Sequence, residues 1–323
     1  MNILITGGAG YIGSSVAYNL IGKGHKIFII DNLSTGNEAV IPKKASFIKS
    51  DISNKKKLKK FLELNDFDLV MHFSGYIRVD ESLRNPKKYY FNNYQKSKIF
   101  LKMCIESGIK NFIFSSTAAV YGSKKRSVTE KDSLNPQHPY AKSKLKVEKF
   151  LKYCAKKNNI KYIILRYFNV AGAEKSMRTG HISKNSAHLI KKVCEKILGK
   201  RKKIKVYRDN YNTPDGSAIR DYIHISDLAK IHDLSLVYLK NRKISQIFNC
   251  GYGKGVSVLE VLRTAKKLYP KKINWTIGKR RKNDIYNSVA DNRKIKKILK
   301  FKPKFNNLRL IIKSSLKWEK KFN

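Results

Sequence analysis

A tyrosine and a lysine four residues apart, Tyr140 and Lys144, form the pattern in this sequence with the most direct chemical meaning. In a helix, residues with this spacing lie on one face, about one turn from each other. A lysine ammonium near a phenol favours the phenolate and lowers the pKa of the tyrosine. Such a tyrosine can take a proton from an alcohol at neutral pH, which predicts chemistry at a carbon that carries a hydroxyl group.

The spacing alone does not single out this pair, because the chain is rich in lysine. A Tyr-x-x-x-Lys pattern is expected about three times by chance in such a composition. It occurs four times, at Tyr94/Lys98, Tyr121/Lys125, Tyr140/Lys144 and Tyr153/Lys157. The residues around each pair must therefore decide which of the four pairs is catalytic.

A glycine-rich segment near the start of the chain, Thr6–Gly13, has the spacing of a phosphate-binding turn. It follows an apolar stretch and precedes an amphipathic one, as a strand–turn–helix unit would. Glycines allow close approach of the backbone to a pyrophosphate, and the helix start offers N–H groups and the positive end of its dipole. A second apolar stretch ends at Asp31, whose carboxylate can bind ribose hydroxyls and would repel a 2′-phosphate. These features predict NAD rather than NADP as the cofactor.

Alternating apolar strands and amphipathic helices in the first half of the chain must position these residues. We expect strands at Ile3–Thr6, Lys26–Asp31, Leu69–Phe73, Asn111–Ser115 and Tyr162–Tyr167, and helices at Tyr11–Gly22, Lys55–Leu64, Tyr90–Ser107 and Tyr140–Asn158. This alternation predicts an α/β fold with a Rossmann-type, doubly wound parallel sheet. The regular alternation of strands and helices then ends, which predicts a smaller C-terminal α/β lobe that binds the substrate. We expect an NAD-binding domain at 1–170, with 221–250 packing back onto it, and the lobe at 171–323.

The composition excludes several classes of protein. The 323 residues carry a formal net charge of +47, but the lysines are scattered and form no basic tail, so we expect no specific nucleic-acid partner. Such a positive field would still attract an anionic substrate. The chain opens almost directly with the apolar stretch Ile3–Ile5 and contains no run of 18 apolar residues, so we expect no signal peptide, no membrane partner and a cytoplasmic location. The four cysteines are widely spaced and no His/Cys cluster has zinc spacing, so we expect free thiols and no metal site.

Together these motifs resemble the extended short-chain dehydrogenase/reductase superfamily over essentially the whole chain. Thr117, at the end of an apolar stretch, completes a set with Tyr140 and Lys144 and selects this tyrosine among the four matches. Within the superfamily the sequence is most similar to the UDP-glucose 4-epimerases. The segments that carry this resemblance are the glycine loop, Asp31–Ser34, His72–Gly75, Ser115–Thr117, Tyr140–Lys144, Leu165–Asn169, Ala171–Ala173, Asn210–Gly216 and Ile219–His224.

The resemblance implies interconversion of UDP-glucose and UDP-galactose. Tyr140 would take the proton of the sugar 4-hydroxyl, Lys144 would lower the pKa of Tyr140 and hold the nicotinamide ribose, and Thr117 would hydrogen-bond the 4-oxygen. A hydride would leave C4 for NAD and return to the opposite face of a 4-keto sugar, without net redox change. The resemblance also implies a UDP-hexose as the partner molecule and a homodimer that packs through Tyr90–Ser107 and Tyr140–Asn158.

The resemblance assigns residues to each ligand. On the cofactor side they are Gly7, Gly10, Tyr11, Ile12, Gly13, Asp31, Asn32, Leu33, Asp51, Ile52, Phe73, Ser74, Gly75, Asn92, Ser115, Tyr140, Lys144 and Tyr167. On the substrate side they are Thr117, Tyr140, Asn169, His188, Leu189, Tyr207, Arg220, Arg281 and Ser288. Arg281 lies where the family has Arg-x-Gly-Asp, but Asn283 replaces the glycine, so Arg280 remains a rival. The lysine that some members carry two residues after the His-Phe-x-Gly motif is absent, since Tyr76–Arg78 follows here.

Several alternatives stay open. Ser288 stands where some members have a tyrosine beside C2 of the sugar, and the smaller residue leaves room for an N-acetyl group, so UDP-GlcNAc and UDP-GalNAc are further candidate substrates. A UDP-pentose or UDP-uronate 4-epimerase is a near alternative. A 4,6-dehydratase would need an Asp-Glu pair where Ala118 and Ala119 stand. A non-catalytic NAD-binding protein or a basic nucleic-acid-binding protein would be a different class, which the intact set of Thr117, Tyr140 and Lys144 disfavours.

Overall fold

A computed structural model describes residues 1–183, 186–207, 210–242, 244–278 and 285–322. Internal contacts divide the chain into two units. The first unit is formed by Met1–Val120, Pro136–Arg166 and Ala229–Phe248, and the second unit by Tyr121–Asn135, Tyr167–Leu228 and Asn249–Asn323.

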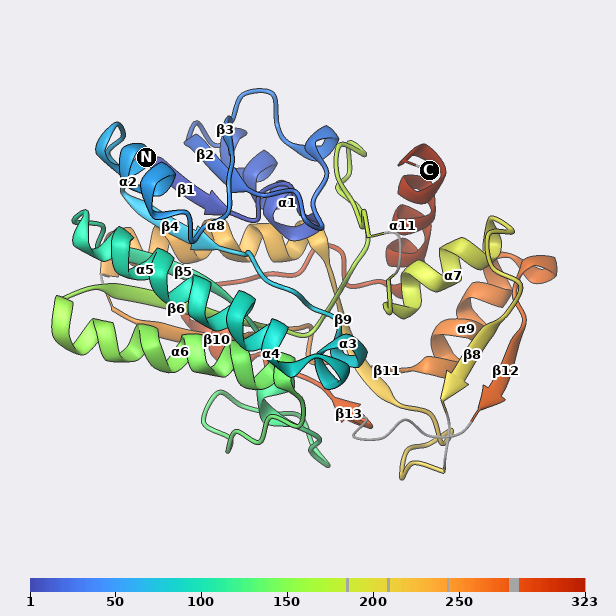
Figure 1. The fold of residues 1–323 in the computed structure, drawn as a ribbon. Helices are drawn as coiled ribbons and strands as arrows, with labels where there is room; N and C mark the ends of the chain where they lie inside the picture. The colour runs from blue at the N-terminus through green and yellow to red at the C-terminus, as the bar shows by residue number, and fades with distance from the viewer. Residues whose placement is uncertain (184–185, 208–209, 243, 279–284, 323) are drawn as a thin grey trace. The chain divides into compact units, whose positions relative to one another are not determined.

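A seven-stranded sheet forms the centre of the first unit, in the order β10-β6-β5-β4-β1-β2-β3 (Figure 1). Its strands are β1 (Asn2–Thr6), β2 (Lys26–Asp31), β3 (Ser46–Lys49), β4 (Leu69–His72), β5 (Asn111–Thr117), β6 (Lys161–Tyr167) and β10 (Gln246–Cys250). The pairs β1–β2, β1–β4, β2–β3 and β4–β5 are parallel. The direction of strand order changes between β1 and β4, and the carboxyl ends of strands at such a point are where doubly wound sheets bind nucleotides. The predicted Rossmann-type fold is confirmed.

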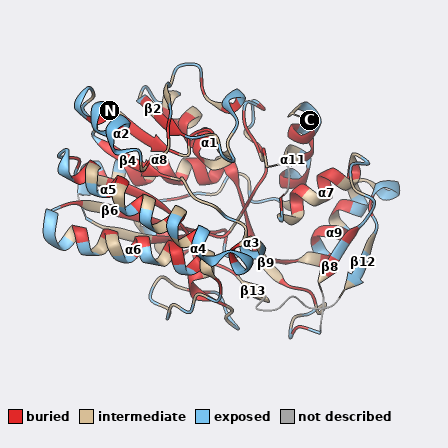
Figure 2. Cartoon of the chain, viewed as in Figure 1, coloured by how far each residue is buried: buried red, intermediate tan, exposed pale blue. Residues whose placement is uncertain are grey.

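Helices cover both faces of this sheet. They are α1 (Tyr11–Ile21), α2 (Lys55–Glu63), α3 (Val79–Arg84), α4 (Pro86–Tyr89), α5 (Lys96–Glu106), α6 (Pro139–Asn158) and α8 (Ile225–Arg242), with short turns η1 (Glu38–Val40) and η3 (Ala118–Tyr121). Side chains of α2, α5 and α6 share one apolar core with β1, β4 and β5. On the other side, the amide of Asn19 in α1 donates to the carbonyl of Ala229 in α8 at 3.5 Å. Figure 2 shows the resulting pattern of buried strands between helices with exposed outer sides.

Helix α6, which carries the Tyr-x-x-x-Lys pair, has clear signals at both ends. Pro139 occupies its first turn, and the ring of His138 accepts a hydrogen bond from the N–H of Ala141 at 3.2 Å. Proline is favoured there because the first N–H groups of a helix have no internal partner. The helix stops at Asn159, whose φ of 50° is left-handed. These signals explain why the predicted helix at Tyr140–Asn158 agrees closely with the structure.

The predicted helix at Tyr90–Ser107 is wrong in its first part. Residues Tyr90–Gln95 form a π-helix, η2, and the regular helix α5 begins at Lys96. A π-helix has i→i+5 hydrogen bonds, and this segment of six residues is little more than one turn, too short to show a period of its own. Hydrophobic periodicity therefore could not reveal it.

The second unit contains shorter elements. They are β7 (Asn169–Ala171), α7 (Leu189–Ile197), β8 (Ile204–Tyr207), β9 (Ile219–His224), β11 (Gly255–Ser257), α9 (Val258–Leu268), η4 (Pro270–Lys272), β12 (Trp275–Gly278), β13 (Asn287–Ser288), α10 (Arg293–Leu299) and α11 (Leu308–Phe322). Strand β9 pairs antiparallel with β11 and parallel with β7 and β13. Strands β8 and β12 form a separate parallel pair.

Three further observations concern the described residues as a whole. All four cysteines are free and buried. In the described ranges, no helix has the length and apolar character needed to cross a membrane. No group of three or more His, Cys, Asp or Glu side chains in those ranges could hold a metal ion.

Candidate active site

The three predicted catalytic residues come together in the first unit. Thr117 is the last residue of β5, and Tyr140 and Lys144 lie one turn apart at the start of α6. The hydroxyl of Thr117 accepts a hydrogen bond from the N–H of Ala119 at 3.2 Å and is hydrogen-bonded to the phenol of Tyr140. The end of β5 and the first turn of α6 therefore place the hydroxyl groups of Thr117 and Tyr140 in contact.

Burial controls the proton affinities of this group. It raises the pKa of Tyr140, and the hydrogen bond with Thr117 opposes that shift. It lowers the pKa of Lys144 to about 7, against the opposing charge of Glu148. The sequence predicts that Lys144 lowers the pKa of Tyr140, and here the structure differs, because Thr117 rather than the ammonium opposes the effect of burial on Tyr140.

The ammonium of Lys144 has no hydrogen-bond partner among the described residues, although the residue is only 3% exposed. It lies 4.8 Å from the centroid of the Phe114 ring, and a Cβ added to Gly75 would stand 3.5 Å from it. A buried cation without hydrogen bonds is costly. This arrangement fits a ligand whose hydroxyl groups accept from the lysine, as the ribose of NAD would.

The glycine loop has the geometry that a pyrophosphate requires. Gly7 has a left-handed φ of 71°, and the N–H of Gly10 donates to its carbonyl at 3.1 Å. A Cβ on Gly13 would lie 2.3 Å from the Gly7 oxygen, so no larger residue fits there. Gly10 caps α1 without a side-chain hydrogen bond, and the first turn, which holds Tyr11 and Ile12, contains no acidic residue. The positive end of the helix dipole is therefore available to an anion.

The residues predicted for the adenosine end of NAD form one connected group. The carboxylate of Asp31 accepts from the N–H of Ala9 at 3.1 Å and of Leu33 at 2.8 Å, and burial raises its pKa. The amide of Asn32 donates to the carboxylate of Asp51 at 3.1 Å. Ile52, next to Asp51, is 6% exposed. Sequence reasoning missed Lys96, which pairs with Asp51 at 2.5 Å, because nothing distinguishes it from the many other lysines.

The remaining cofactor residues lie at or near strand ends of the sheet. Phe73, Ser74 and Gly75 follow β4, and the N–H of Ser74 donates to the Thr6 hydroxyl at 3.2 Å, which ties this segment to β1. Ser115 lies within β5, Tyr167 is the last residue of β6, and Asn92 lies in η2. The amide of Asn92 donates to Asn93 Oδ1 at 3.2 Å.

Three of the predicted substrate residues lie on neighbouring strands of the second unit. Arg220 of β9 is the register partner of Ser288 in β13, and Asn169 of β7 is the partner of Tyr222, two residues further along β9. Arg220 is half-buried and donates to the carbonyl of Ile219 at 2.9 Å. The strand pairing therefore brings Arg220 and Ser288 side by side.

The other substrate residues lie outside this group of strands. His188 precedes α7, Leu189 begins it, and Tyr207 is the last residue of β8. Burial lowers the pKa of His188, whose ring lies 5.0 Å from that of His181. Arg281 and its rival Arg280 fall outside the described residues.

A buried ion pair behind the catalytic helix face was not foreseen. Glu148, one turn after Lys144, accepts from Arg166 of β6 at 3.0 and 2.7 Å and from the hydroxyl of Ser116 at 2.5 Å. Both side chains of the ion pair are almost fully buried. The spacing of Lys144 and Glu148 places Glu148 on the same helix face, but it does not identify Arg166 of another element as the partner.

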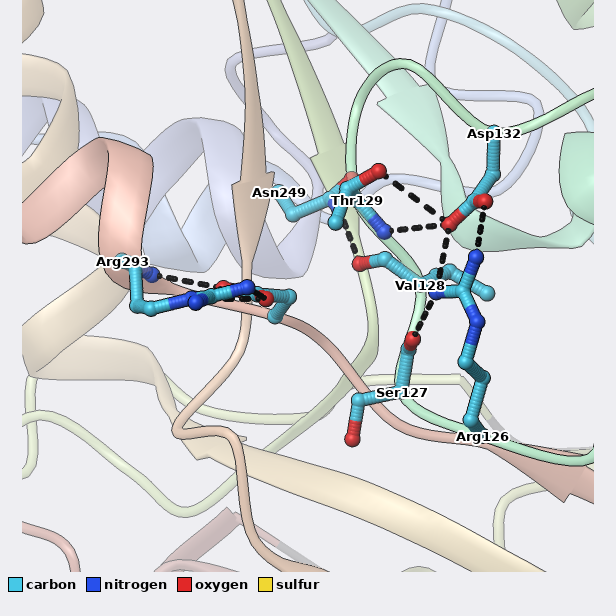
Figure 3. A network of polar contacts seen from close by, with 8 residues as sticks. Arg126, Ser127, Val128, Thr129, Asp132, Asn249 and Arg293 are labelled. Carbon is cyan, nitrogen blue, oxygen red and sulfur yellow. Dashed lines mark hydrogen bonds and ion pairs between the residues drawn. The ribbon is translucent and has the colours of Figure 1, made fainter.

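A second unforeseen feature anchors the loop 121–135 within the second unit (Figure 3). The N–H of Val128 donates to the carbonyl of Val289, next to Ser288, and the N–H of Asp291 donates to the carbonyl of Val128. The amide of Asn249 also donates to that carbonyl, at 2.8 Å. The loop is thus held against the residues that follow β13.

Comparison with known proteins identifies the family of this chain. The family model described as "NAD dependent epimerase/dehydratase family" matches residues 3–251. The UDP-glucose 4-epimerase of Azospirillum brasilense is 41% identical over 98% of this chain and 92% of its own length. The UDP-glucose 4-epimerase of Bifidobacterium longum, solved in complex with NAD+ and UDP, is 33% identical, covers 99% of this chain and 98% of its own, and has a TM-score of 0.93. The UDP-Glc/GlcNAc 4-epimerase of Campylobacter jejuni is 39% identical, with a TM-score of 0.86 and 99% of each chain covered.

The catalytic group, the glycine loop and these comparisons agree with one another. The matches cover nearly the whole chain, so both units take part in the similarity. This chain belongs to the NAD-dependent epimerase/dehydratase family and, within it, to the UDP-glucose 4-epimerases.

Proposed function

We propose that this chain interconverts UDP-glucose and UDP-galactose, and that its two units divide the work. The first unit holds NAD and performs the chemistry at C4 of the sugar, and the second unit binds the UDP-sugar. The observation that carries this proposal is the contact of Tyr140 with Thr117, one helical turn from the unpartnered ammonium of Lys144. Oxidation of an alcohol removes a proton and a hydride. Tyr140 would be the base that takes the proton, and Lys144 would be the cation that binds the hydride acceptor.

Each of the three residues has a definite task. Tyr140, as the phenolate, takes the proton of the sugar 4-hydroxyl and later returns it. Thr117 donates to the oxygen that holds the negative charge, and Lys144 binds ribose hydroxyls. NAD, which the glycine loop, Asp31 and Lys144 would hold, would supply the group that takes up a hydride from C4 and gives it back to the opposite face of the sugar.

Arg220 is the group of the second unit best suited to the diphosphate. A guanidinium offers two parallel N–H donors to phosphate oxygens. Asn169 would bind a phosphate or sugar oxygen from the neighbouring strand, and His188, Leu189 and Tyr207 would line the uracil site. Arg281 stays part of this proposal as a second diphosphate ligand.

The test is conversion of UDP-galactose to UDP-glucose by the purified protein, with no NAD added. Epimerisation consumes no NAD overall, so turnover by copurified cofactor is expected. UDP-pentoses and UDP-uronates are assayed in parallel. If the protein turns over one of these and not UDP-galactose, that sugar nucleotide replaces the hexose as the proposed substrate. If the protein is inactive on all of them and binds random DNA at physiological salt, the nucleic-acid-binding alternative is favoured.

Activity on UDP-GlcNAc and UDP-GalNAc is a second candidate function. Ser288, the register partner of Arg220, is a small and half-buried residue. A serine leaves space for an N-acetyl group that a tyrosine would fill. The Campylobacter jejuni relative carries both Glc and GlcNAc in its name. We expect Ser288→Tyr to abolish turnover of UDP-GlcNAc and to keep turnover of UDP-galactose. If neither the wild type nor Ser288→Tyr turns over UDP-GlcNAc, this function is refuted.

A homodimer is the proposed assembly. Phe91 in η2 and Tyr153 in α6 are 60% and 54% exposed, which is unusual for large apolar side chains. Sedimentation is expected to give a dimer for the wild type and a monomer for the double variant Phe91→Lys/Tyr153→Lys. The control is Ile277→Lys in β12, because Ile277 is 53% exposed as well and lies in the other unit. A dimer that survives the double variant would rule out these helices as the interface.

A cytoplasmic location completes the proposal. Four free, buried cysteines suit a reducing compartment. Cell fractionation is expected to recover the protein with cytoplasmic markers, and recovery with membranes would contradict this.

A further inference from the structure

Asp221 of β9 is a fully buried carboxylate that holds two other segments of the second unit. Its Oδ1 accepts from the N–H of Tyr252 at 2.8 Å. Its Oδ2 accepts from the N–H of Gly253 at 2.8 Å and from the N–H of Ala290 at 3.2 Å. Tyr252 and Gly253 follow β10, whereas Ala290 follows β13. One side chain therefore ties the loop after β10 and the end of β13 to β9.

Main-chain donors hold this charge, because no cation of the described residues pairs with Asp221. Burial raises its pKa to about 6, and the three N–H groups oppose that shift, so it is ionised at neutral pH. A Cβ added to Gly251 would lie 2.5 Å from Asp221 Oδ2 and 2.8 Å from the Cβ of Ala290, so the chain packs against the carboxylate as closely as glycine allows. An amide would offer one acceptor oxygen instead of two, so it could not serve both segments equally well.

The segment that Asp221 holds carries a residue proposed to contact the sugar. Ser288 lies two residues before Ala290 and is the register partner of Arg220, which precedes Asp221 in β9. Successive side chains of a strand point to opposite faces, and register partners share a face. Arg220 and Ser288 therefore lie together on one face of the sheet, where both are half-buried, and Asp221 acts from the other face.

Strand β13 depends on contacts of this kind because it has only two residues. Its pairing with β9 alone gives it few hydrogen bonds. Val128 holds the residues after β13 by its main chain, since its N–H donates to the carbonyl of Val289 and its carbonyl accepts from the N–H of Asp291 (Figure 3). The N–H of Ala290, between those two residues, is the group that Asp221 takes. The exit of β13 is thus fixed at three consecutive residues.

We propose that Asp221 is a positioning residue that holds Ser288 of β13 beside Arg220 and so sets the affinity for the UDP-sugar. This inference rests on the proposed function and deepens it. Asp221 faces away from the proposed ligand and acts through the main chain of Ala290. Its loss frees the end of β13, so the KM for UDP-galactose should rise. The kcat should stay within about twofold, because the three catalytic residues belong to the first unit.

The closing experiment compares two buried aspartates that each have three donors. Asp227 is 2% exposed. Its donors are the N–H groups of Lys304 and Phe305 and the hydroxyl of Tyr252, and none of them follows β13. We expect Asp221→Ala to raise the KM for UDP-galactose by about tenfold or more, the effect of one weakened hydrogen bond to a charged group, and Asp227→Ala to keep the wild-type KM. Both variants should be less stable toward urea, because each leaves buried donors unpaired.

A conservative variant separates positioning from a general loss of stability. Asp221→Asn keeps one acceptor oxygen, so its KM should lie between those of the wild type and Asp221→Ala. If Asp221→Ala does not fold, Gly251→Ala carries the test. The added methyl group would push against the carboxylate and Ala290 while the charge stays in place, and the same rise in KM is expected.

Amide hydrogen exchange gives a readout that needs no substrate. In Asp221→Ala, the N–H of Ala290 loses its acceptor, so its exchange should become at least about tenfold faster relative to that of Phe305. In Asp227→Ala, the N–H of Phe305 loses its acceptor, and the order should be reversed. Each variant should therefore release its own donors.

An unchanged KM in folded Asp221→Ala, or an equal rise of KM in Asp227→Ala, would overturn the proposal. Equal acceleration of exchange at Ala290 and Phe305 in both variants would do the same, because it would reflect general destabilisation. A wild type that is inactive on UDP-galactose would overturn the proposed function instead, and the exchange data would then decide by themselves whether Asp221 holds β13.

Discussion

The two units hold their functional side chains in different ways. In the first unit, Thr117, Tyr140 and Lys144 lie on the end of a buried strand and the first turns of a long helix, and hydrogen bonds hold Thr117 and Tyr140 in place. In the second unit, Arg220 and Ser288 lie beside each other on short strands and are half-buried. Under the proposed function, the first unit holds the groups for the chemistry in fixed positions, whereas the second unit offers a guanidinium and a small side chain to the UDP-sugar.

The largest expected effect comes from Tyr140→Phe. It removes the proton acceptor and leaves the packing of the ring, so kcat should fall by about 10²–10⁴-fold, the usual contribution of acid–base catalysis. The KM for UDP-galactose should change little, because the diphosphate ligands belong to the second unit. Steady-state kinetics measures both, and a variant with normal turnover would remove Tyr140 from the mechanism.

Buried ion pairs offer a comparison of stability between the units. Glu148 pairs with Arg166 in the first unit, and Glu319 pairs with Lys191 in the second, all with almost fully buried side chains. Removal of one charge leaves the other buried and unpaired, which costs about 3–5 kcal/mol. Urea denaturation of Glu148→Gln and Glu319→Gln should show losses of that size in both cases.

These two variants should differ in catalysis. The charge of Glu148 raises the pKa of Lys144, so Glu148→Gln lowers that pKa further and leaves less ammonium at neutral pH. Its kcat should fall at pH 7, and Glu319→Gln should keep the wild-type kcat. Equal kcat values for both variants would show that the two ion pairs are only structural.

Arg220→Lys should give the opposite kinetic pattern from Tyr140→Phe. The lysine keeps the charge but loses the planar pair of donors, and a charged hydrogen bond is worth about 1.5–3 kcal/mol. The KM for UDP-galactose should rise by about tenfold to a hundredfold, with kcat reduced only slightly. A large loss of kcat with an unchanged KM would contradict the division of work between the units.

The amount that the sequence could predict also differs between the units. The alternation of strands and helices and the glycine loop predicted the sheet and the cofactor, because these depend on local periodicity and spacing. The Tyr140/Lys144 pair was selected among four matches only with Thr117 and the family resemblance, and the ion pair of Glu148 depends on which side chains meet after folding. In the second unit, Arg220 was selected through family motifs, since one arginine in a chain of 70 lysines and arginines carries no local signal.

The smallest expected effect is a loss of folding stability at acidic pH, and groups in both units should contribute to it. His72 in the first unit and His224 in the second are buried and neutral, and burial is the main cause that lowers their pKa values to about 3 and about 4. An unfolded histidine titrates near pH 6.5, so between that pH and the folded pKa the unfolded state binds one more proton. The free energy of unfolding therefore falls as the pH drops below about 6.5, by up to about 1.4 kcal/mol per pH unit for each histidine.

Urea denaturation of the wild type, His72→Gln and His224→Gln at pH 7.0, 6.0 and 5.0 measures these slopes. Each variant loses hydrogen bonds at every pH, because His72 contacts Thr6 and Ser97 and His224 contacts Ser226 and Ser314. It also loses one titrating group, so its stability should depend less steeply on pH than that of the wild type. A slope that stays at the wild-type value in His72→Gln would mean that His72 is already protonated in the folded protein. The hydrogen bond between His72 and Thr6, in which Nδ1 of the neutral ring accepts, would then have to be reversed, because a protonated Nδ1 donates, whereas Nε2 donates to the Ser97 hydroxyl in either state.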